Sequence, residues 1–376
     1  MSKLDELIKE LCSNGVEYKE LGECCEFNRG SSITKASVIE GNVPVIAGGQ
    51  KPAYYHNVSN RDVETIVIAG SGAYAGFVSY WTIPIFVSDA FTINPNDRLI
   101  TKYLYHFLKN MQEEIHDLKK GGGVPHVYGK DLARFKIPIP PLEVQKEIVN
   151  ILDKFVKLEA ELEAELEARK IQYEFYRGKM LNDNLNTYLL NEICEYSKDR
   201  ISSDELNEDN YIGVDNLLQY KRGKQKSSCI PQSGNWTKYI IGDVLIGNIR
   251  PYLRKIWLAD NDGGTNGDVL AIRIKNNDLI IPRYLYYVLS SEDFFEYNTQ
   301  YSKGAKMPRG DKTKIMEYMI PVTPLEKQNK IVEILDKFDT LINDISEGLP
   351  AEIKMRREQY EYYRDKLLNF EEVCNG

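Results

Sequence analysis

The chain has 376 residues, of which 42% are hydrophobic and 28% are charged, and its formal net charge is −8. This length and balance are typical of a globular protein with two or more domains. The acidic total at first argues against a nucleic-acid partner, but basic intervals without acids weaken that objection. Six cysteines without C-x-x-C spacing and four histidines without ligand spacing indicate neither a zinc site nor a disulfide framework.

The N-terminal segment MSKLDELIKELCSNG mixes acids with apolar residues at helical spacing and lacks the continuous apolar core of a signal peptide. Apolar runs such as TIVIAG and IPIFV are much shorter than the roughly 20 residues that a membrane-spanning helix needs. We therefore expect a cytoplasmic protein.

The first part of the chain, residues 1–140, is predicted to form a mixed α/β globule. Short β-rich runs such as VPVIAGG, ETIVIAGSG, FVSYW and IFVSDAFTI precede a helical segment, YLYHFLKNMQEEI. The glycines of GSGAYAG, residues 70–76, are not followed by the lysine-serine pair of a phosphate loop, so we interpret this segment as a turn.

A long helix is predicted over residues 141–182. Pro141 suits a helix start, and the apolar residues after it recur at spacings of three and four. A continuous helix of this length would span about 60 Å, which is too long for a compact core element. The apolar stripe suits one partner helix, and it consists of Ile148, Ile151, Leu152, Phe155, Leu158 and Leu162.

Within this helix, residues 158–169 read LEAELEAELEAR, a Leu-Glu-Ala-Glu unit written nearly three times. Each added unit would lengthen a helix by roughly 6 Å and rotate the next part of the chain by about 40°. We interpret the segment as a spacer of adjustable length. A charged, solvated helix that only links its neighbours is the alternative.

The chain contains an internal repeat. PLEVQKEIVNILDKF from Pro141 returns as PLEKQNKIVEILDKF from Pro324 with 11 of 15 positions identical, displaced by 183 residues. QYEFYRGKMLN from Gln172 returns as QYEYYRDKLLN from Gln359, displaced by 187 residues. The second copy therefore has four more residues between the two blocks, where the first copy carries its LEAE units.

The second copy is predicted to repeat the plan of the first. A second α/β globule over 183–323 contains the runs YIGVDN, DVLIGNI, KIWLAD and VLAIRI and a helical YLYYVLSSEDFFEY. A second spacer helix over 324–370, which Gly348 and Pro350 are expected to interrupt, precedes a tail, 371–376. Its stripe consists of Ile331, Ile334, Leu335, Phe338, Leu341, Ile342 and Ile345.

We predict that the two long helices pack as an antiparallel coiled coil between two pseudo-symmetric globules. The alternative is that each stripe packs onto its own globule. Similar helices beside divergent globules suggest one scaffold that presents two recognition surfaces.

Motifs of a self-contained enzyme are missing from the sequence. There is no G-x-x-x-x-G-K-[ST] loop, no G-x-S-x-G and no carboxylate-lysine cluster of a nuclease. NPND, residues 94–97, lacks the second proline and the aromatic residue of an amino-methyltransferase motif. This pattern favours a binding protein.

The repeated blocks, each after a globule that opens with LGE or LNE, resemble the specificity subunit of type I restriction-modification enzymes. The resemblance covers essentially the whole chain and is specific in the helices. It implies that each globule is a target recognition domain for half of a split, asymmetric DNA site. It further implies docking of two modification subunits that carry S-adenosylmethionine and methylate adenine. Restriction subunits add ATP-driven translocation and cleavage. No cofactor or metal is expected in this chain.

Candidate DNA-binding residues come from basic intervals without acids and from glycine-rich loops. Basic side chains and amides are the groups that contact phosphates and base edges. In the first copy the candidates are Gln50, Lys51, Ser71, Tyr74, Lys119, Lys120 and His126, and in the second they are Lys221, Arg222, Lys224, Arg250, Tyr252, Lys303, Lys306 and Arg309. The alternative for any one of them is a solvated surface role, and for the tyrosines also packing against a sheet edge.

An aromatic belt lies near the end of each predicted helix. It consists of Tyr173, Phe175 and Tyr176 in the first copy and Tyr360, Tyr362 and Tyr363 in the second. Tyr173, Tyr176, Tyr360 and Tyr363 are candidates for docking a modification subunit, and packing onto the adjacent globule is the alternative.

Two other classes of function stay open at this point. One is a single-chain methyltransferase or nuclease with an unrecognised site, which would modify DNA unaided. The other is a coiled-coil assembly scaffold, which would show no sequence-dependent DNA binding even with a methyltransferase partner.

Overall fold

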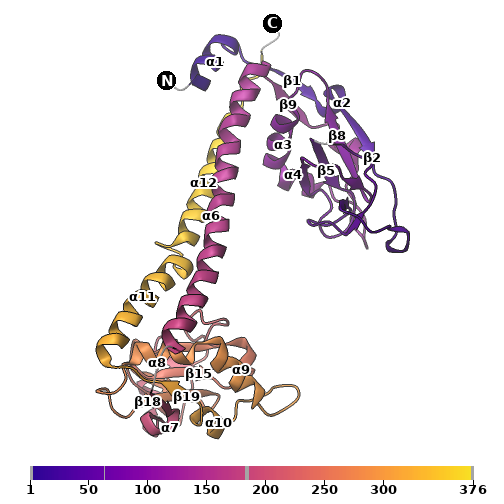
Figure 1. Ribbon diagram of the computed structural model, residues 1–376. Coiled ribbons are helices and arrows are strands. Elements are labelled where there is room, and N and C mark those ends of the chain that lie inside the picture. The colour runs from indigo at the N-terminus through magenta and orange to yellow at the C-terminus, as the bar shows by residue number, and fades with distance from the viewer. Residues whose placement is uncertain (1–2, 63, 183–185, 374–376) are drawn as a thin grey trace. The chain divides into compact units, whose positions relative to one another are not determined.

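The computed structural model describes residues 3–62, 64–182 and 186–373 and divides the chain into two compact units (Figure 1). Unit 1 comprises Met1–Ala164 and Ala351–Gly376, and unit 2 comprises Glu165–Pro350. Residues 183–185, at the start of the predicted second globule, and 374–376, in the predicted tail, lie outside the described residues. Each unit combines one globule with helical segments from both sequence repeats.

The globule of unit 1 is built on an antiparallel four-stranded sheet, in the order β2 (Cys25–Arg29), β8 (Ala90–Pro95), β5 (Thr65–Ala69) and β6 (Val78–Trp81). All five residues of β5 are buried, as the apolar run TIVIA predicts. A second sheet has the order β4 (Tyr54–His56), β3 (Val43–Ile46), β7 (Phe86–Val87), and β1 (Glu17–Glu20) pairs with β9 (Lys136–Ile139).

The helices of unit 1 pack mainly around the first sheet. Helix α3 (Thr101–Asn110) presents Tyr103, Leu104 and Phe107 to the same apolar core as Ile66 and Ile68 of β5. The shorter helices are α1 (Lys3–Leu11), α2 (Leu21–Cys24), η1 (Lys35–Ser37), α3 (Thr101–Asn110), α4 (Gln112–Asp117) and α5 (Gly129–Leu132).

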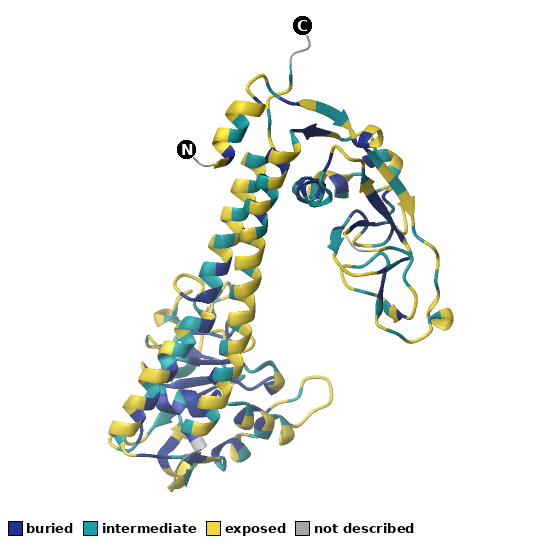
Figure 2. Ribbon diagram, turned by 45° about the horizontal axis from the view of Figure 1, so that its top comes forward, coloured by how far each residue is buried: buried dark blue, intermediate teal, exposed yellow. Residues whose placement is uncertain are grey.

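Unit 2 repeats the first sheet and the two-stranded pair of unit 1, whereas its second sheet has four strands instead of three. Its antiparallel sheet has the order β11 (Cys194–Tyr196), β18 (Val269–Ile274), β15 (Val244–Gly247) and β16 (Ile256–Leu258), and β10 (Thr187–Leu189) pairs with β19 (Met319–Pro321). A second sheet has the order β12 (Arg200–Ser202), β14 (Asn235–Tyr239), β17 (Gly263–Thr265) and β13 (Tyr211–Ile212). The central strands of both units are buried (Figure 2), and the predicted α/β fold is confirmed.

The shorter helices of unit 2 correspond to those of unit 1. Helix α8 begins at Pro282, whose fixed φ suits the first turn, and it buries Tyr284, Leu285 and Val288 in the core. These helices are α7 (Leu190–Ile193), η2 (Ser203–Glu205), η3 (Pro251–Leu253), α8 (Pro282–Leu289), α9 (Glu292–Gln300) and α10 (Lys312–Met316).

The first long helix, α6 (Leu142–Asn182), is unbroken and passes from unit 1 into unit 2. Within unit 1, α12 (Leu349–Leu367) runs antiparallel to it, since Phe155 stacks on Tyr363 at 5.3 Å and Glu159 accepts hydrogen bonds from Arg357 (Figure 1). Ile148 of α6 also joins the core of the globule. Both alternatives for the stripe therefore hold, because the helix packs on its partner and on its globule.

Within unit 2, the last part of α6 packs beside α11 (Leu325–Asn343), with Tyr176 stacked on Phe338 at 6.4 Å. The second spacer helix is interrupted as predicted, because α11 ends before a turn in which Asp344 accepts a hydrogen bond from the N–H of Ser346. Gly348 lies against this turn, where a Cβ would come within 2.4 Å of the carbonyl oxygen of Thr340.

A buried glutamine attaches the start of each long helix to its globule. Gln145 is fully buried, and its side-chain oxygen accepts the N–H of Ile100 at 2.9 Å. Its Nε2 donates to the carbonyl oxygens of Arg98 and Pro140 at 2.8 and 2.7 Å. The same three bonds recur in unit 2, where Gln328 bonds to Ile281, Leu279 and Thr323. This glutamine, identical in both repeats, fixes how each helix leaves its globule.

The second contact between helix and globule has different chemistry in the two units. In unit 1, buried His106 lies 3.1 Å from Asp153 and 3.1 Å from the hydroxyl of Tyr360. In unit 2 the equivalent contact is made by Tyr287, whose hydroxyl donates to Asp336 at 2.5 Å. The helical aspartate is kept while its partner on the globule changes.

We predict that Gln145→Leu lowers the free energy of unfolding of unit 1 by at least about 1–3 kcal/mol, because it leaves the Ile100 N–H and two carbonyl oxygens buried without partners. Urea unfolding of the full chain, followed by amide hydrogen exchange, should show faster exchange at Ile100. Exposed Glu143, two residues earlier, provides the control Glu143→Ala, which should have little effect. Equal effects of the two substitutions would contradict this role.

Candidate nucleic-acid interface

In unit 1, an exposed glycine-rich loop lies between α4 and α5. Lys120 and His126 close it, since the N–H of each donates to the carbonyl oxygen of the other at 2.9 Å. The base of this loop, here called loop 120–126, rests on the turn after β5, where the N–H of Gly72 donates to the carbonyl oxygen of Pro125 at 2.9 Å. A central strand therefore supports an exposed loop.

Unit 2 has the same construction between α9 and α10. Lys303 and Arg309 exchange backbone hydrogen bonds of 2.8 Å and close loop 303–309. The N–H of Arg250, on the turn after β15, donates to the carbonyl oxygen of Pro308 at 2.7 Å. The two loops share a hydrogen-bonded frame but differ in the side chains that they present.

An ion pair anchors the first lysine of each loop to the helix that comes after it. Lys120 contacts Asp131 at 2.8 Å and Lys303 contacts Asp311 at 2.6 Å. The hydrogen bond from Lys120 lowers the pKa of Asp131, and the hydrogen bond from Lys303, with the N–H groups that Asp311 caps, lowers the pKa of Asp311. Both carboxylates are therefore ionised at neutral pH.

The candidate residues of unit 1 gather around loop 120–126. Gly48 lies against Ser71, where a Cβ would come within 2.4 Å of its carbonyl oxygen, and this brings the turn that carries Gln50 and Lys51 next to the loop. Lys119 donates to the carbonyl oxygen of Ala73 at 3.1 Å. The structure thus brings together Gln50, Lys51, Ser71, Tyr74, Lys119, Lys120 and His126.

The members of this group differ in how available their side chains are. Gln50, Lys51 and Tyr74 are exposed. Ser71 is buried, and its hydroxyl donates to the carboxylate of Asp89. Ser71 therefore supports the turn after β5, and a contact of its hydroxyl with a ligand would require this bond to break.

Most basic candidates of unit 2 are already engaged with other groups. Four form ion pairs, namely Lys221 with Glu292 at 2.9 Å, Lys224 with Asp260 at 3.3 Å, Lys303 with Asp311 at 2.6 Å and Arg309 with Asp268 at 2.9 Å. Arg222 donates to the carbonyl oxygen of Gln219 at 3.2 Å. Within the described part of the chain, the exposed side chains of Arg250, Tyr252 and Lys306 form no hydrogen bond or ion pair.

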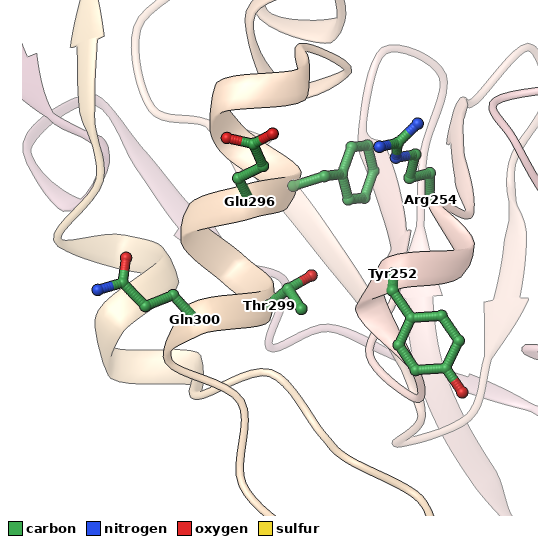
Figure 3. Close-up of a pocket in the computed structure, with 6 residues that line it drawn as sticks. Tyr252, Arg254, Glu296, Thr299 and Gln300 are labelled. Atoms are coloured by element: carbon green, nitrogen blue, oxygen red, sulfur yellow. The ribbon is translucent and has the colours of Figure 1, made fainter.

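A hollow of about 390 Å³ lies between η3 and α9 of unit 2 (Figure 3). Tyr252 of η3 and Arg254, the residue after η3, line it on one side, and Phe295, Glu296, Thr299 and Gln300 line it from α9. Arg254 is paired with Glu292 at 2.5 Å.

The aromatic belt divides into buried and exposed members. Tyr173 packs on Phe338 at 6.1 Å and is 7% exposed, and burial raises its pKa. Tyr360 bonds to His106, and burial raises its pKa to about 12. These two tyrosines therefore pack within their units, which was the alternative to docking a partner. Tyr176 and Tyr363 are 41% and 40% exposed.

Two aromatic residues outside the candidate set are the most exposed members of the belt. Phe175 is 65% exposed and its equivalent Tyr362 is 62% exposed. Each forms an edge-to-face pair with the next residue, with ring centroids 5.4 Å apart for Tyr176 and 5.3 Å apart for Tyr363. Helical periodicity could have identified them, since both lie two positions from a residue of the apolar face.

Two further observations limit the kinds of site. In the described ranges, no three histidine, cysteine, aspartate or glutamate side chains are grouped so that they could hold a metal ion. None of the described helices combines the length and the apolar composition needed to cross a membrane.

Comparison with known proteins identifies a consistent set of relatives. A family model described as Type I restriction modification DNA specificity domain matches twice, over residues 13–168 and 182–355. The EcoR124I/EcoR124II type I restriction enzyme specificity subunit of Escherichia coli is 28% identical over 420 aligned positions, which cover 98% of each chain.

Two solved structures share the fold. The S subunit of a type I restriction-modification system from M. genitalium superposes with a TM-score of 0.62 at 19% identity, over 94% of this chain and 96% of that one. A chain from a structural study of complex assembly in a type I R-M system gives a TM-score of 0.58 at 16% identity, over 94% and 98%.

We predict that Lys303→Ala returns the pKa of Asp311 towards its ordinary value of about 3.8, because the main hydrogen bond to its carboxylate is lost. Because the folded pKa of Asp311 is depressed, the contribution of this anchor is present above the unfolded pKa and is lost as the pH falls through the folded pKa. NMR titration of the Asp311 carboxyl carbon measures the change. Lys306→Ala is the control, and an equal shift in both variants would contradict the pairing.

Proposed function

Because the chain belongs to the type I restriction-modification DNA specificity family, we propose that each of its units reads one half of a split, asymmetric DNA site. A member of this family is the DNA-recognition subunit of a restriction-modification system and not its catalytic subunit. Its partners are DNA and the other subunits of the system. The finer proposal is that two modification subunits bind it, supply S-adenosylmethionine and methylate adenine, while restriction subunits use ATP and Mg²⁺.

The observation that carries this proposal is the pair of equivalent exposed loops on unlike units. Loop 120–126 reads KGGGVPH and loop 303–309 reads KGAKMPR, yet both are closed and supported by the same backbone hydrogen bonds. The major groove offers only a few base pairs to one recognition element. Two such elements of different composition fit two short, different DNA words.

We assign DNA-binding roles to individual residues by whether their side chains are exposed and whether they already form an ion pair. We propose that Gln50, Lys51, Tyr74, Arg250, Tyr252 and Lys306 contact DNA directly, because their side chains are exposed. The lysines and arginines that form ion pairs have their positive charge compensated by a carboxylate. We propose that they contact phosphates, where a phosphate oxygen takes the place of the carboxylate. This second group consists of Lys120, Lys221, Lys224, Lys303 and Arg309. We also propose phosphate contacts for Lys119, Arg222 and His126, whose side chains form no ion pair with another described residue.

The unbroken helix α6 suits the role of a spacer between the two words. Its LEAE units lie at residues 158–169 and are largely exposed, with ion pairs such as Arg169 to Glu165 at 3.1 Å on the surface. Leu158 of this segment is 43% exposed, Leu166 packs against the core of unit 2, and the glutamates favour a solvated helix. Whole units can therefore be added without changing the chemistry of either globule.

Two equivalent exposed aromatic pairs support the proposal of two modification subunits. Phe175 with Tyr176 belongs to unit 2, and Tyr362 with Tyr363 belongs to unit 1. Exposed aromatic side chains are typical anchors of protein interfaces. Because the two pairs arise from the same repeated block, the same partner would fit both.

We predict that inserting one LEAE unit after Glu165 keeps both DNA words but changes the unread gap by one to two base pairs, since about 6 Å of helix rise corresponds to that many 3.4 Å steps. Sequencing of methylated bases in cells that express the variant with its modification subunit measures the site. The control is a variant of unchanged length in which one LEAE becomes LQAQ. A gap that stays constant in the insertion variant would refute the spacer role.

We predict that Phe175→Ala and Tyr362→Ala each release one of two modification subunits, and that the double variant releases both, because each removes the most exposed ring of one docking pair. Mass measurement of the copurified complex counts the subunits. The control Ile241→Ala removes a side chain of unit 2 that is 67% exposed but lies outside the long helices. Two modification subunits retained by the folded double variant would exclude these pairs as the docking sites.

A further inference from the structure

The turn after the central strand is built alike in the two units but differs at one residue. In unit 1 the N–H of Gly70 donates to the carbonyl oxygen of Asp89 at 3.1 Å, and in unit 2 the N–H of Asn248 donates to that of Asp268 at 2.8 Å. Two residues later, Gly72 and Arg250 each donate to the proline of the neighbouring loop. Gly72 and Arg250 therefore occupy equivalent positions.

This position requires a left-handed backbone in both units. Gly72 has a φ of +84° and Arg250 has a φ of +51°. Glycine adopts this conformation without steric cost, whereas a residue with a Cβ is strained in it. Unit 1 thus carries the residue that the backbone favours, and unit 2 carries an arginine despite the strain. Non-glycine residues held in this region concentrate at functional sites.

The strain around Arg250 is shared by a cluster of neighbouring residues. Of the five non-glycine residues with positive φ in the described ranges, four lie here: Tyr220, Lys221, Arg250 and Arg254. The N–H groups of Tyr220 and Lys221 donate to the carbonyl oxygens of Leu253 and Arg254 at 2.9 and 3.0 Å. These cross-links, with the bond from Arg250 to Pro308, hold the backbone beneath the arginine in one place.

The charge of Arg250 is left uncompensated while its neighbours are paired. Asp268 is bound by Arg309, and Glu292 is bound by Lys221 and Arg254. The exposed guanidinium of Arg250 forms no hydrogen bond or ion pair with another described residue. An exposed guanidinium on a fixed backbone is suited to bidentate recognition, because less freedom is lost when it binds.

We propose that Arg250 reads a guanine in the DNA word of unit 2, by donating two hydrogen bonds to O6 and N7 in the major groove. This is the commonest specific contact between a protein and a base. The inference rests on the proposed function of unit 2 and assigns its specificity to one side chain. The equivalent Gly72 has no side chain, so unit 1 must read its word with other residues.

Arg250→Gly tests this proposal because a structural role and a reading role predict opposite results. Glycine relieves the strain, so the thermal midpoint of the full chain should stay the same or rise. Binding of the purified complex with modification subunits is then measured on duplexes in which each base pair of the mapped site is replaced in turn. The wild-type complex should lose about 5- to 150-fold in affinity when one guanine is replaced, and the variant should lose that preference alone.

Tyr220→Gly is the matched control, since Tyr220 shares the left-handed backbone at φ +57° and is 59% exposed. It should keep the guanine preference, and loss of that preference in the control would overturn the assignment. A lower thermal midpoint of Arg250→Gly, or an equal loss of affinity for all duplexes as expected of a phosphate contact, would also overturn it. If the wild-type complex binds all duplexes alike, the proposed function itself fails.

Discussion

The apolar stripe of a long helix must be shielded from water along its whole length. The helices that shield the stripe of α6 determine how each unit is built. The apolar residues of α6 cannot all face one globule, because a helix of 41 residues extends far beyond it. α12 covers its first part and α11 covers its last part. Each unit is therefore completed by a helix from the other repeat, and the buried Gln145 and Gln328 fix the junction of helix and globule.

This division separates the features that must stay constant from those that are free to vary. The glutamine, the helical aspartates and the strand order of the first four-stranded sheet are common to both units, because they hold each globule on the paired helices. The loops need only their closing backbone bonds, which any sequence with suitable turn residues can form. A glycine in one unit and a strained arginine in the other can thus occupy the same turn, and different DNA words can be read from one scaffold.

The helices and strands could be predicted from the sequence because they depend on local periodicity, and the repeat doubled that signal. The sequence could not predict which side chains are free to bind a ligand, because this depends on partners that are distant in the chain. Lys303 and Lys306 look alike in the sequence, yet only Lys303 meets Asp311. Tyr173 and Phe175 belong to one aromatic belt, yet Phe338 buries the first while the second stays exposed. The left-handed backbone of Arg250 has no sequence signal, because glycine normally marks that conformation.

The central claim is that two dissimilar readers in one polypeptide select a single bipartite site. Mapping of methylated adenines in DNA from cells that express the wild-type chain with a modification subunit of its system tests this claim most directly. We expect two short, different words separated by a gap of fixed length without sequence preference. A continuous site, two identical words, or methylation that does not depend on this chain would contradict the claim.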